Sequence, residues 1–178
     1  MKSSIALIGF MGTGKTVVGK LLAQELGKEF IELDALVEKK AGKSIPEIFR
    51  QDGEVKFREL EIEVVKEVAG RKNAVIACGG GVVLNNINID RLRRECVIVC
   101  LTAAPSVILK RTSRDKAGRP LLAGGDRSMQ INALLKLRQP FYKRAADITV
   151  NTSRLKAEGV AGIIIDRLEK HESHRSQK

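Results

Sequence analysis

The sequence predicts an α/β fold in which helices cover both faces of a five-stranded parallel sheet. Short apolar runs alternate with longer stretches of helical periodicity along the chain. These apolar runs are almost continuously hydrophobic, which is typical of parallel strands buried on both faces. Parallel strands joined by helices place those helices on both sides of the sheet through right-handed crossovers. The expected strands are Ser4–Gly9, Phe30–Leu33, Ala74–Cys78, Cys96–Leu101 and Ile148–Val150.

The segments between these strands carry apolar residues at helical spacing. After the first strand, for example, Val18, Leu22 and Leu26 recur every fourth residue and so lie on one face of a helix. No internal repeat interrupts the alternation of strands and helices. The expected helices are Lys15–Leu26, Ala35–Ala41, Gly53–Ala69, Pro105–Thr112, Ser128–Tyr142 and Ala157–Lys170.

The length of 178 residues suits one domain, which we place at residues 1–170. The stretch Arg114–Asp126 breaks the alternation with three glycines, a proline and several charges. Loops of this length are usually functional, so we expect a mobile lid at about residues 112–126. The last residues, 171–178, are polar, and we expect them to be a disordered tail.

Composition narrows the class of protein. No stretch approaches the roughly 20 apolar residues that span a bilayer, and the N-terminus has no secretory cleavage pattern. We therefore expect a cytoplasmic protein without a membrane partner. The net charge of +11 is compatible with nucleic acid, but aromatic residues, on which bases stack, make up only 3% of the chain. The charge fits better with attraction of small anions, and we expect no nucleic-acid partner.

A complete phosphate-binding loop, or P-loop, follows the first strand and precedes the first helix. Its residues are Gly9-Phe10-Met11-Gly12-Thr13-Gly14-Lys15-Thr16. Glycines let backbone amides turn toward phosphate oxygens, and the start of the helix adds partial positive charge. Gly12, Thr13 and Gly14 are expected to contact ATP, Lys15 to reach its β- and γ-phosphates, and the Thr16 hydroxyl to hold Mg²⁺.

Asp34 comes directly after the second expected strand, where ligands of open parallel sheets bind. A carboxylate there can orient an attacking hydroxyl and accept its proton. It can equally cap the helix Ala35–Ala41, because Asp is a favoured N-cap residue. Position alone leaves both interpretations open.

Glu61 falls within the apolar stripe of the helix Gly53–Ala69, so it needs a partner. Arg58 lies one turn earlier and is within reach. Glu61 could therefore hold Arg58 still and leave the other edge of the guanidinium for a ligand carboxylate. A plain ion pair on the helix surface is the alternative.

Three further features are a glycine triplet after a strand, an arginine in the lid and an arginine in a helix. Gly79-Gly80-Gly81 follows the third strand and allows a close approach, although it could simply be a tight exit from the strand. Arg119, beside Pro120 in the lid, could stabilise charge on a phosphoryl group in transfer. Arg138 lies late in the helix Ser128–Tyr142 and by itself indicates nothing.

Taken together, these residues closely resemble the shikimate kinase family, in the family's order from about residue 5 to residue 154. The P-loop alone is shared by many families, whereas the combination is specific. The matching features are the P-loop, Asp34, Phe57-Arg58 with Glu61, Gly79–Gly81, Arg119-Pro120-Leu121-Leu122, and Arg138 ahead of Pro140 and Tyr142.

The resemblance implies a three-layer P-loop kinase fold with strand order 2-3-1-4-5, and transfer of the ATP γ-phosphate to the 3-hydroxyl of shikimate. It implies that Asp34, Arg58, Gly80, Gly81 and Arg138 bind shikimate, the two arginines through its carboxylate. Lys15, Asp34 and Arg119 would be catalytic, with Arg119 reaching the ATP phosphates. We expect shikimate, ATP and Mg²⁺ as ligands, and a monomer.

Two positions depart from the family pattern. Glu32 stands where many members have an Asp that helps to hold Mg²⁺ through water. The adenine loop, which usually begins with Asp and ends with Pro, starts here with Asn151 and has no nearby proline. Adenine contacts are therefore assigned only to Arg111 and Arg154.

Other classes of protein fit less well. Paired arginines favour an acidic acceptor, but a kinase for gluconate or a nucleoside monophosphate stays open. A GTPase-like switch would need a guanine-reading Asn-Lys-x-Asp motif, which the sequence lacks. A nucleic-acid-dependent ATPase is opposed by the scarcity of aromatic residues.

Overall fold

The computed structural model of the chain describes residues 2–113, 121 and 126–176. Most of the expected lid, including Arg119, lies outside the described residues. The predicted five-stranded parallel sheet is confirmed, with the order β2-β3-β1-β4-β5. The strands are β1 (Ser4–Gly9), β2 (Glu29–Glu32), β3 (Ala74–Ala77), β4 (Cys96–Thr102) and β5 (Ile148–Asn151).

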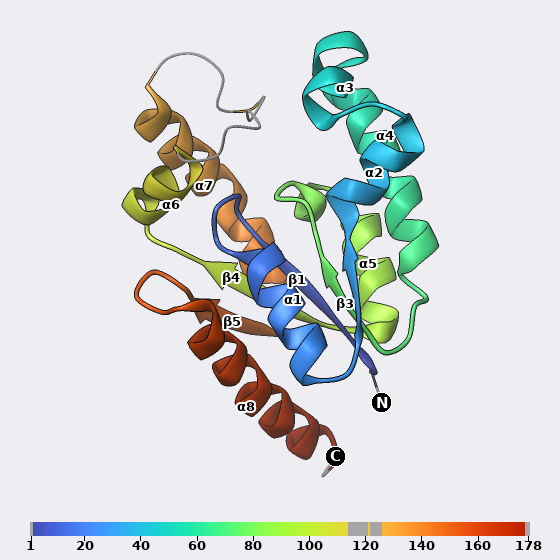
Figure 1. Ribbon diagram of the computed structural model, residues 1–178, viewed down its shortest axis with the longest axis vertical. Coiled ribbons are helices and arrows are strands. Elements are labelled where there is room, and N and C mark those ends of the chain that lie inside the picture. The colour runs from blue at the N-terminus through green and yellow to red at the C-terminus, as the bar shows by residue number, and fades with distance from the viewer. Residues whose placement is uncertain (1, 114–120, 122–125, 177–178) are drawn as a thin grey trace.

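Helices cover both faces of this sheet, as Figure 1 shows with α1 and α8 together on one side and α4 and α5 on the other. The helices are α1 (Lys15–Glu25), α2 (Leu33–Ala41), α3 (Ile45–Gln51), α4 (Gly53–Val68), α5 (Asn86–Glu95), α6 (Pro105–Thr112), α7 (Arg127–Ala145) and α8 (Ala157–Ser176), with a 3₁₀ turn, η1, at Val82–Leu84. Among the described residues, none of the helices combines the length and the hydropathy that a membrane span requires.

The central strand β1 divides the core in two because successive side chains point to opposite faces. Ile5 and Leu7 pack in the cluster that contains residues of α1 and α8. Ala6 and Ile8 pack in the other cluster, with residues of α4, α5 and α7. Burial on both faces explains why the strand is continuously apolar in sequence.

Two helices were not expected from the sequence. The short helix α3 begins with a capping box in which Ser44 and Glu47 bond reciprocally, a local signal that the apolar spacing did not reveal. The helix α5 is polar along most of its length and buries mainly Ile89 and Leu92. Tertiary packing, rather than a strong apolar stripe, therefore defines α5.

The helix α8 also differs from expectation, since it continues to Ser176 where we expected it to end at Lys170. Residues 171–176, which we expected in a disordered tail, are thus assigned to α8. These six residues include neither Gly nor Pro, so nothing in them breaks the helix.

Candidate active site

The P-loop joins β1 to α1, and its backbone requires glycine at particular positions. Gly9 has φ +141°, and a Cβ there would stand 2.2 Å from the carbonyl oxygen of Leu101 on β4. Gly12 has φ +75°, and its Cβ would lie 3.0 Å from Thr112 Cγ2. Glycine is therefore required at both positions for the loop to pack against β4 and α6, and this packing fixes the loop whose amides can face a phosphate.

Lys15 extends across this loop. Its Nζ donates hydrogen bonds to the carbonyl oxygens of Gly9 and Phe10, at 2.9 and 3.0 Å. Those bonds hold the ammonium group above the loop at the N-terminus of α1, where the helix also carries partial positive charge. The position suits a cation that neutralises phosphate oxygens.

Thr16, in the first turn of α1, and Glu32, the last residue of β2, meet at the P-loop. The Thr16 hydroxyl is hydrogen-bonded to the Glu32 carboxyl group. Burial raises the pKa of Glu32 and Asp34 adds to the rise, while the Thr16 bond and the charge of Lys15 oppose it. Glu32 Oε2 is buried without a hydrogen-bond partner among the described residues. An unsatisfied carboxylate oxygen beside a P-loop hydroxyl fits a hydrated Mg²⁺ ion, which favours oxygen ligands and retains waters.

Arg111 links α6 to the P-loop and to the loop after β5. Its Nη1 donates to Gly12 O at 3.1 Å and to Thr152 Oγ1 at 3.0 Å, and its Nη2 donates to Thr152 O at 2.9 Å. Thr152 Oγ1 in turn lies 3.0 Å from Thr13 O. Arg111 therefore lies beside the P-loop, whereas Arg154 is exposed in the loop that follows β5.

On the other side of the P-loop, Arg58 is held by two carboxylates of its own helix, α4. Its Nη1 lies 3.2 and 3.1 Å from the two oxygens of Glu61, a residue that is only 2% exposed. Its Nε and Nη2 donate to Glu54 Oε1 at 3.2 and 3.0 Å. The pairing with Glu61 is as predicted, but Glu54 occupies the edge that we expected to face a ligand. Because the Glu54 side chain is 48% exposed, a ligand carboxylate can replace it.

The glycine triplet after β3 lies against these charged groups. A Cβ on Gly79 would be 2.7 Å from Asp34 Oδ1 and 3.1 Å from Glu61 Oε1. A Cβ on Gly81 would be 2.3 Å from Arg58 Nη1. The triplet is therefore more than a tight exit from the strand, since it lets three charged side chains close around the backbone.

Asp34 lies in the first turn of α2, and the N-cap of that helix is Glu32. The alternative interpretation of Asp34 as the N-cap is therefore wrong, because the helix begins at Leu33, before Asp34. Burial raises the pKa of Glu61, and the nearby charge of Asp34 adds to that rise while Arg58 and Arg138 oppose it. Two carboxylates and two guanidinium groups thus share one small region.

Arg138 reaches this region from α7. It is 3% exposed, its guanidinium carbon lies 5.9 Å from the centre of the Phe10 ring, and its Nη1 would be 3.9 Å from a Cβ on Gly80. Its Nε has no hydrogen-bond partner in the described part of the chain. A buried guanidinium with an unused N–H is costly, and an incoming anion can satisfy it.

With this geometry established, a comparison with known families decides the assignment. A family model described as shikimate kinase matches residues 11–169. The chain belongs to the shikimate kinase family. The match begins inside the P-loop and includes Lys15, Asp34 and Arg138.

Individual members of the family are similar over nearly their whole length. A shikimate kinase of Caldanaerobacter subterraneus is 51% identical over 162 residues, 91% of this chain and 94% of the relative. One of Thermodesulfovibrio yellowstonii is 45% identical over 167 residues, 94% of this chain and 95% of the relative. The structure of a shikimate kinase from Acinetobacter baumannii in complex with shikimate matches with a TM-score of 0.91 and 38% identity, covering 95% of this chain and 94% of that one.

The site of this family member combines predicted residues with others that the sequence did not reveal. The structure brings the predicted acceptor residues together around Gly79–Gly81, and the predicted nucleotide residues Lys15, Thr16 and Arg111 around the P-loop. Sequence reasoning missed Glu54, Thr152 and the hydrogen bond that the Tyr142 hydroxyl donates to the carbonyl oxygen of Gly80. Glu54 was detectable, because it lies four residues before Arg58 on the same helix. The contacts of Thr152 and Tyr142 depend on the tertiary fold.

Proposed function

We propose that this chain transfers the γ-phosphate of ATP to the 3-hydroxyl of shikimate, giving shikimate 3-phosphate and ADP. The observation that carries the proposal is Arg138. A buried arginine whose Nε has no partner among the described residues, near Gly80 and, like Arg58, close to Glu61, is a site for an anionic group. Shikimate has one carboxylate, and planar guanidinium groups bind carboxylates through two parallel hydrogen bonds.

In this proposal the P-loop binds ATP. Gly12, Thr13 and Gly14 provide backbone amides for the phosphates, and Lys15 neutralises the β- and γ-phosphates. Arg111 and Arg154 lie on the adenine side, and Arg119 reaches the phosphates from the lid. Thr16 would hold Mg²⁺, with Glu32 acting through water, and the ion would neutralise charge on the phosphates. The Oε2 atom of Glu32, which has no hydrogen-bond partner in the described part of the chain, supports this role.

Shikimate lies between α4, α7 and the Gly79–Gly81 segment. Arg58 and Arg138 hold its carboxylate, which places the 3-hydroxyl toward Asp34 and the P-loop. The hydroxyl oxygen bonds to the γ-phosphorus, the bond from that phosphorus to the bridging oxygen of ADP breaks, and the hydroxyl proton passes to Asp34. Such a transfer depends mostly on positioning and electrostatics, so this small set of groups is sufficient.

The test is a coupled ADP-release assay with shikimate, gluconate and nucleoside monophosphates as separate acceptors, with Lys15→Ala as the inactive control. We expect turnover with shikimate only, and none from a folded Lys15→Ala variant. Turnover with gluconate or a nucleoside monophosphate but not with shikimate would overturn the proposal. A monomeric state and a cytoplasmic location belong to the same proposal, and analytical ultracentrifugation tests the first.

A further inference from the structure

We infer that Tyr142 is a positioning residue whose hydroxyl fixes Arg138 and Gly80 relative to each other, and thereby sets the affinity for the acceptor carboxylate. The inference rests on the proposed function, because it assumes that Arg138 binds that carboxylate. Tyr142 is the only tyrosine in the chain. It lies four residues after Arg138 on α7, so both side chains are on the same face of the helix.

The Tyr142 hydroxyl joins two segments that are far apart in sequence. It donates a hydrogen bond to the carbonyl oxygen of Gly80, 62 residues earlier in the chain. It also shares a hydrogen bond with Arg138, which can only donate, so the hydroxyl oxygen accepts. The same hydroxyl therefore donates its proton to the Gly80 carbonyl and accepts a hydrogen bond from Arg138.

Both hydrogen bonds of the Tyr142 hydroxyl, which together bridge Arg138 and Gly80, are buried. Tyr142 is 6% exposed and Arg138 is 3% exposed, so water cannot easily replace either bond. Burial also raises the pKa of Tyr142, which keeps the hydroxyl protonated and able to donate. Arg138 already has one N–H without a partner among the described residues. If the hydroxyl is removed, Arg138 loses the hydroxyl oxygen as an acceptor, and the Gly80 carbonyl oxygen is left without its donor.

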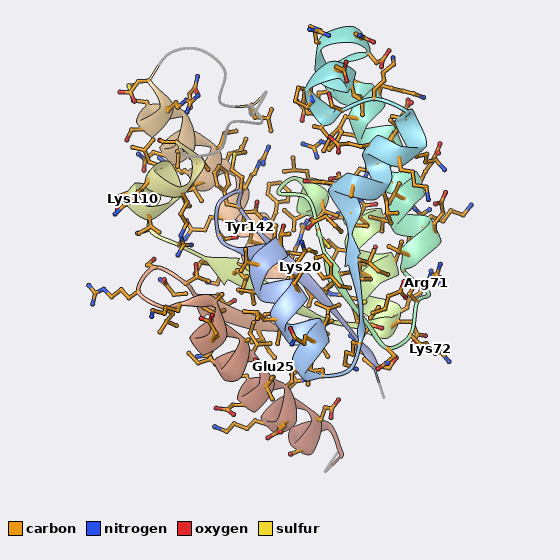
Figure 2. All side chains as sticks on the ribbon, in the orientation of Figure 1. Lys20, Glu25, Arg71, Lys72, Lys110 and Tyr142 are labelled. Carbon is orange, nitrogen blue, oxygen red and sulfur yellow. The ribbon has the colours of Figure 1, made fainter. Side chains whose placement is uncertain are left out.

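The arrangement favours a role in the site over a role in stability alone. Both groups that the hydroxyl contacts are expected to bind the acceptor, and neither is expected to bind ATP. The Tyr142 ring itself packs in the core cluster that includes Phe10 and lies close to the P-loop (Figure 2). It also lines a pocket of about 470 Å³ together with residues of β4 and α7. The substitution Tyr142→Phe keeps that packing and removes only the hydroxyl. Its effect therefore reports on how Arg138 and Gly80 are positioned relative to each other.

The decisive variant is Tyr142→Phe, measured beside Thr149→Val. Thr149 lines the same pocket, and its substitution likewise removes one hydroxyl without a large change of shape. We expect Tyr142→Phe to raise the KM for shikimate about 10- to 100-fold, the range for a lost hydrogen bond to a charged group, and to leave the KM for ATP unchanged. Thr149→Val should match the wild type in both constants.

Two measurements separate alignment from general destabilisation. In the double variant Tyr142→Phe with Arg138→Lys, the losses should be clearly less than additive, because Tyr142 acts through Arg138. Calorimetric titration of shikimate without ATP should show the same weakening for Tyr142→Phe as the kinetics do. A thermal melt confirms that each variant is folded under the conditions of the assay.

The outcomes distinguish the two proposals. If the wild type neither binds nor phosphorylates shikimate, the proposed function fails, and this inference fails with it. If the wild type is active and folded Tyr142→Phe has a normal KM for shikimate, only the inference about Tyr142 is overturned. An equal rise in both KM values, or fully additive losses in the double variant, would also contradict it.

Discussion

The carboxylate of Glu61 lies 3.1 Å from Nη1 of Arg58, one helical turn away on α4, and is almost completely buried. Burial of a carboxylate is unfavourable unless a cation compensates it. The ion pair therefore compensates the buried charge of Glu61 and holds the Arg58 side chain in one orientation. That orientation puts Nη1 of Arg58 against the backbone of Gly81, at the proposed acceptor site.

Glu61→Gln should weaken shikimate binding moderately and destabilise the fold. The amide keeps the shape but loses the charge that holds Arg58. We expect the KM for shikimate to rise about fivefold and the free energy of unfolding to fall by about 1–3 kcal/mol, as for a hydrogen bond with a charged group. Steady-state kinetics and urea denaturation measure the two effects. A stable variant with unchanged KM would contradict a holding role for Glu61.

Glu54→Gln should have the opposite effect on binding. Glu54 occupies Nε and Nη2 of Arg58, so a substrate carboxylate must compete with it. Removing that charge should lower the KM for shikimate about two- to fivefold, the range for an exposed ion pair. The control is Glu59→Gln on the same helix, whose partner is Lys56. A higher KM in Glu54→Gln would mean that Glu54 orients Arg58 for the substrate and does not compete with it.

Asp34→Asn should lower kcat by about 10² or more, the usual contribution of a positioned acid–base group, with a smaller change in either KM. Asp34 is inside the first turn of α2 and is not its N-cap, so loss of capping cannot explain a fall in activity. Single-turnover kinetics at saturating ATP and shikimate measure the step directly. A fall of less than about threefold would remove Asp34 from the catalytic residues.

The buried thiol of Cys100 predicts a loss of stability at alkaline pH. Burial raises its pKa to about 11, from a usual value near 9. Between those pH values the unfolded thiol ionises and the folded one stays protonated, so the folded state binds more protons and stability falls as pH rises. The contribution of the thiol is complete below about pH 9 and is lost as pH rises toward 11. The melting temperature should therefore fall less between pH 7.5 and pH 10.5 in Cys100→Ala than in the wild type. An equal fall in both proteins would refute this prediction.

The fold could be predicted from the sequence because its strands are buried on both faces. Continuous apolar runs such as Ser4–Gly9 have few alternative environments, and each observed strand end lies within one residue of the predicted one. The helix α5 escaped prediction because its few buried apolar residues interrupt a polar segment. Its position depends on contacts with α4 and β4 that local periodicity does not encode.

The site was predicted unevenly for a similar reason. The P-loop and the pair of Arg58 and Glu61 are local in sequence, so spacing alone reveals them. The bond between Tyr142 and Gly80 joins residues 62 positions apart, and no spacing rule indicates it. The ion pair between Glu54 and Arg58 is also local, but an exposed glutamate has no apolar stripe to mark it.

The final prediction concerns the two arginines that define the acceptor. Arg58→Lys and Arg138→Lys should each raise the KM for shikimate sharply with little change in the KM for ATP. Lysine keeps the charge but cannot form two parallel hydrogen bonds with a carboxylate. We expect a loss of about 2–4 kcal/mol in kcat/KM at each position, the range for a buried charge pair that loses one partner. The loss should be larger at Arg138, which is the more buried of the two.

The control is a shikimate analogue that lacks the carboxylate. Wild type should use it poorly, and the lysine variants should lose little further activity with it, because the contact that they weaken is already absent. The ratio of kcat/KM for shikimate to that for the analogue therefore measures carboxylate recognition and nothing else. If the variants lose as much with the analogue as with shikimate, the arginines do not bind the carboxylate. The acceptor must then be held by other groups.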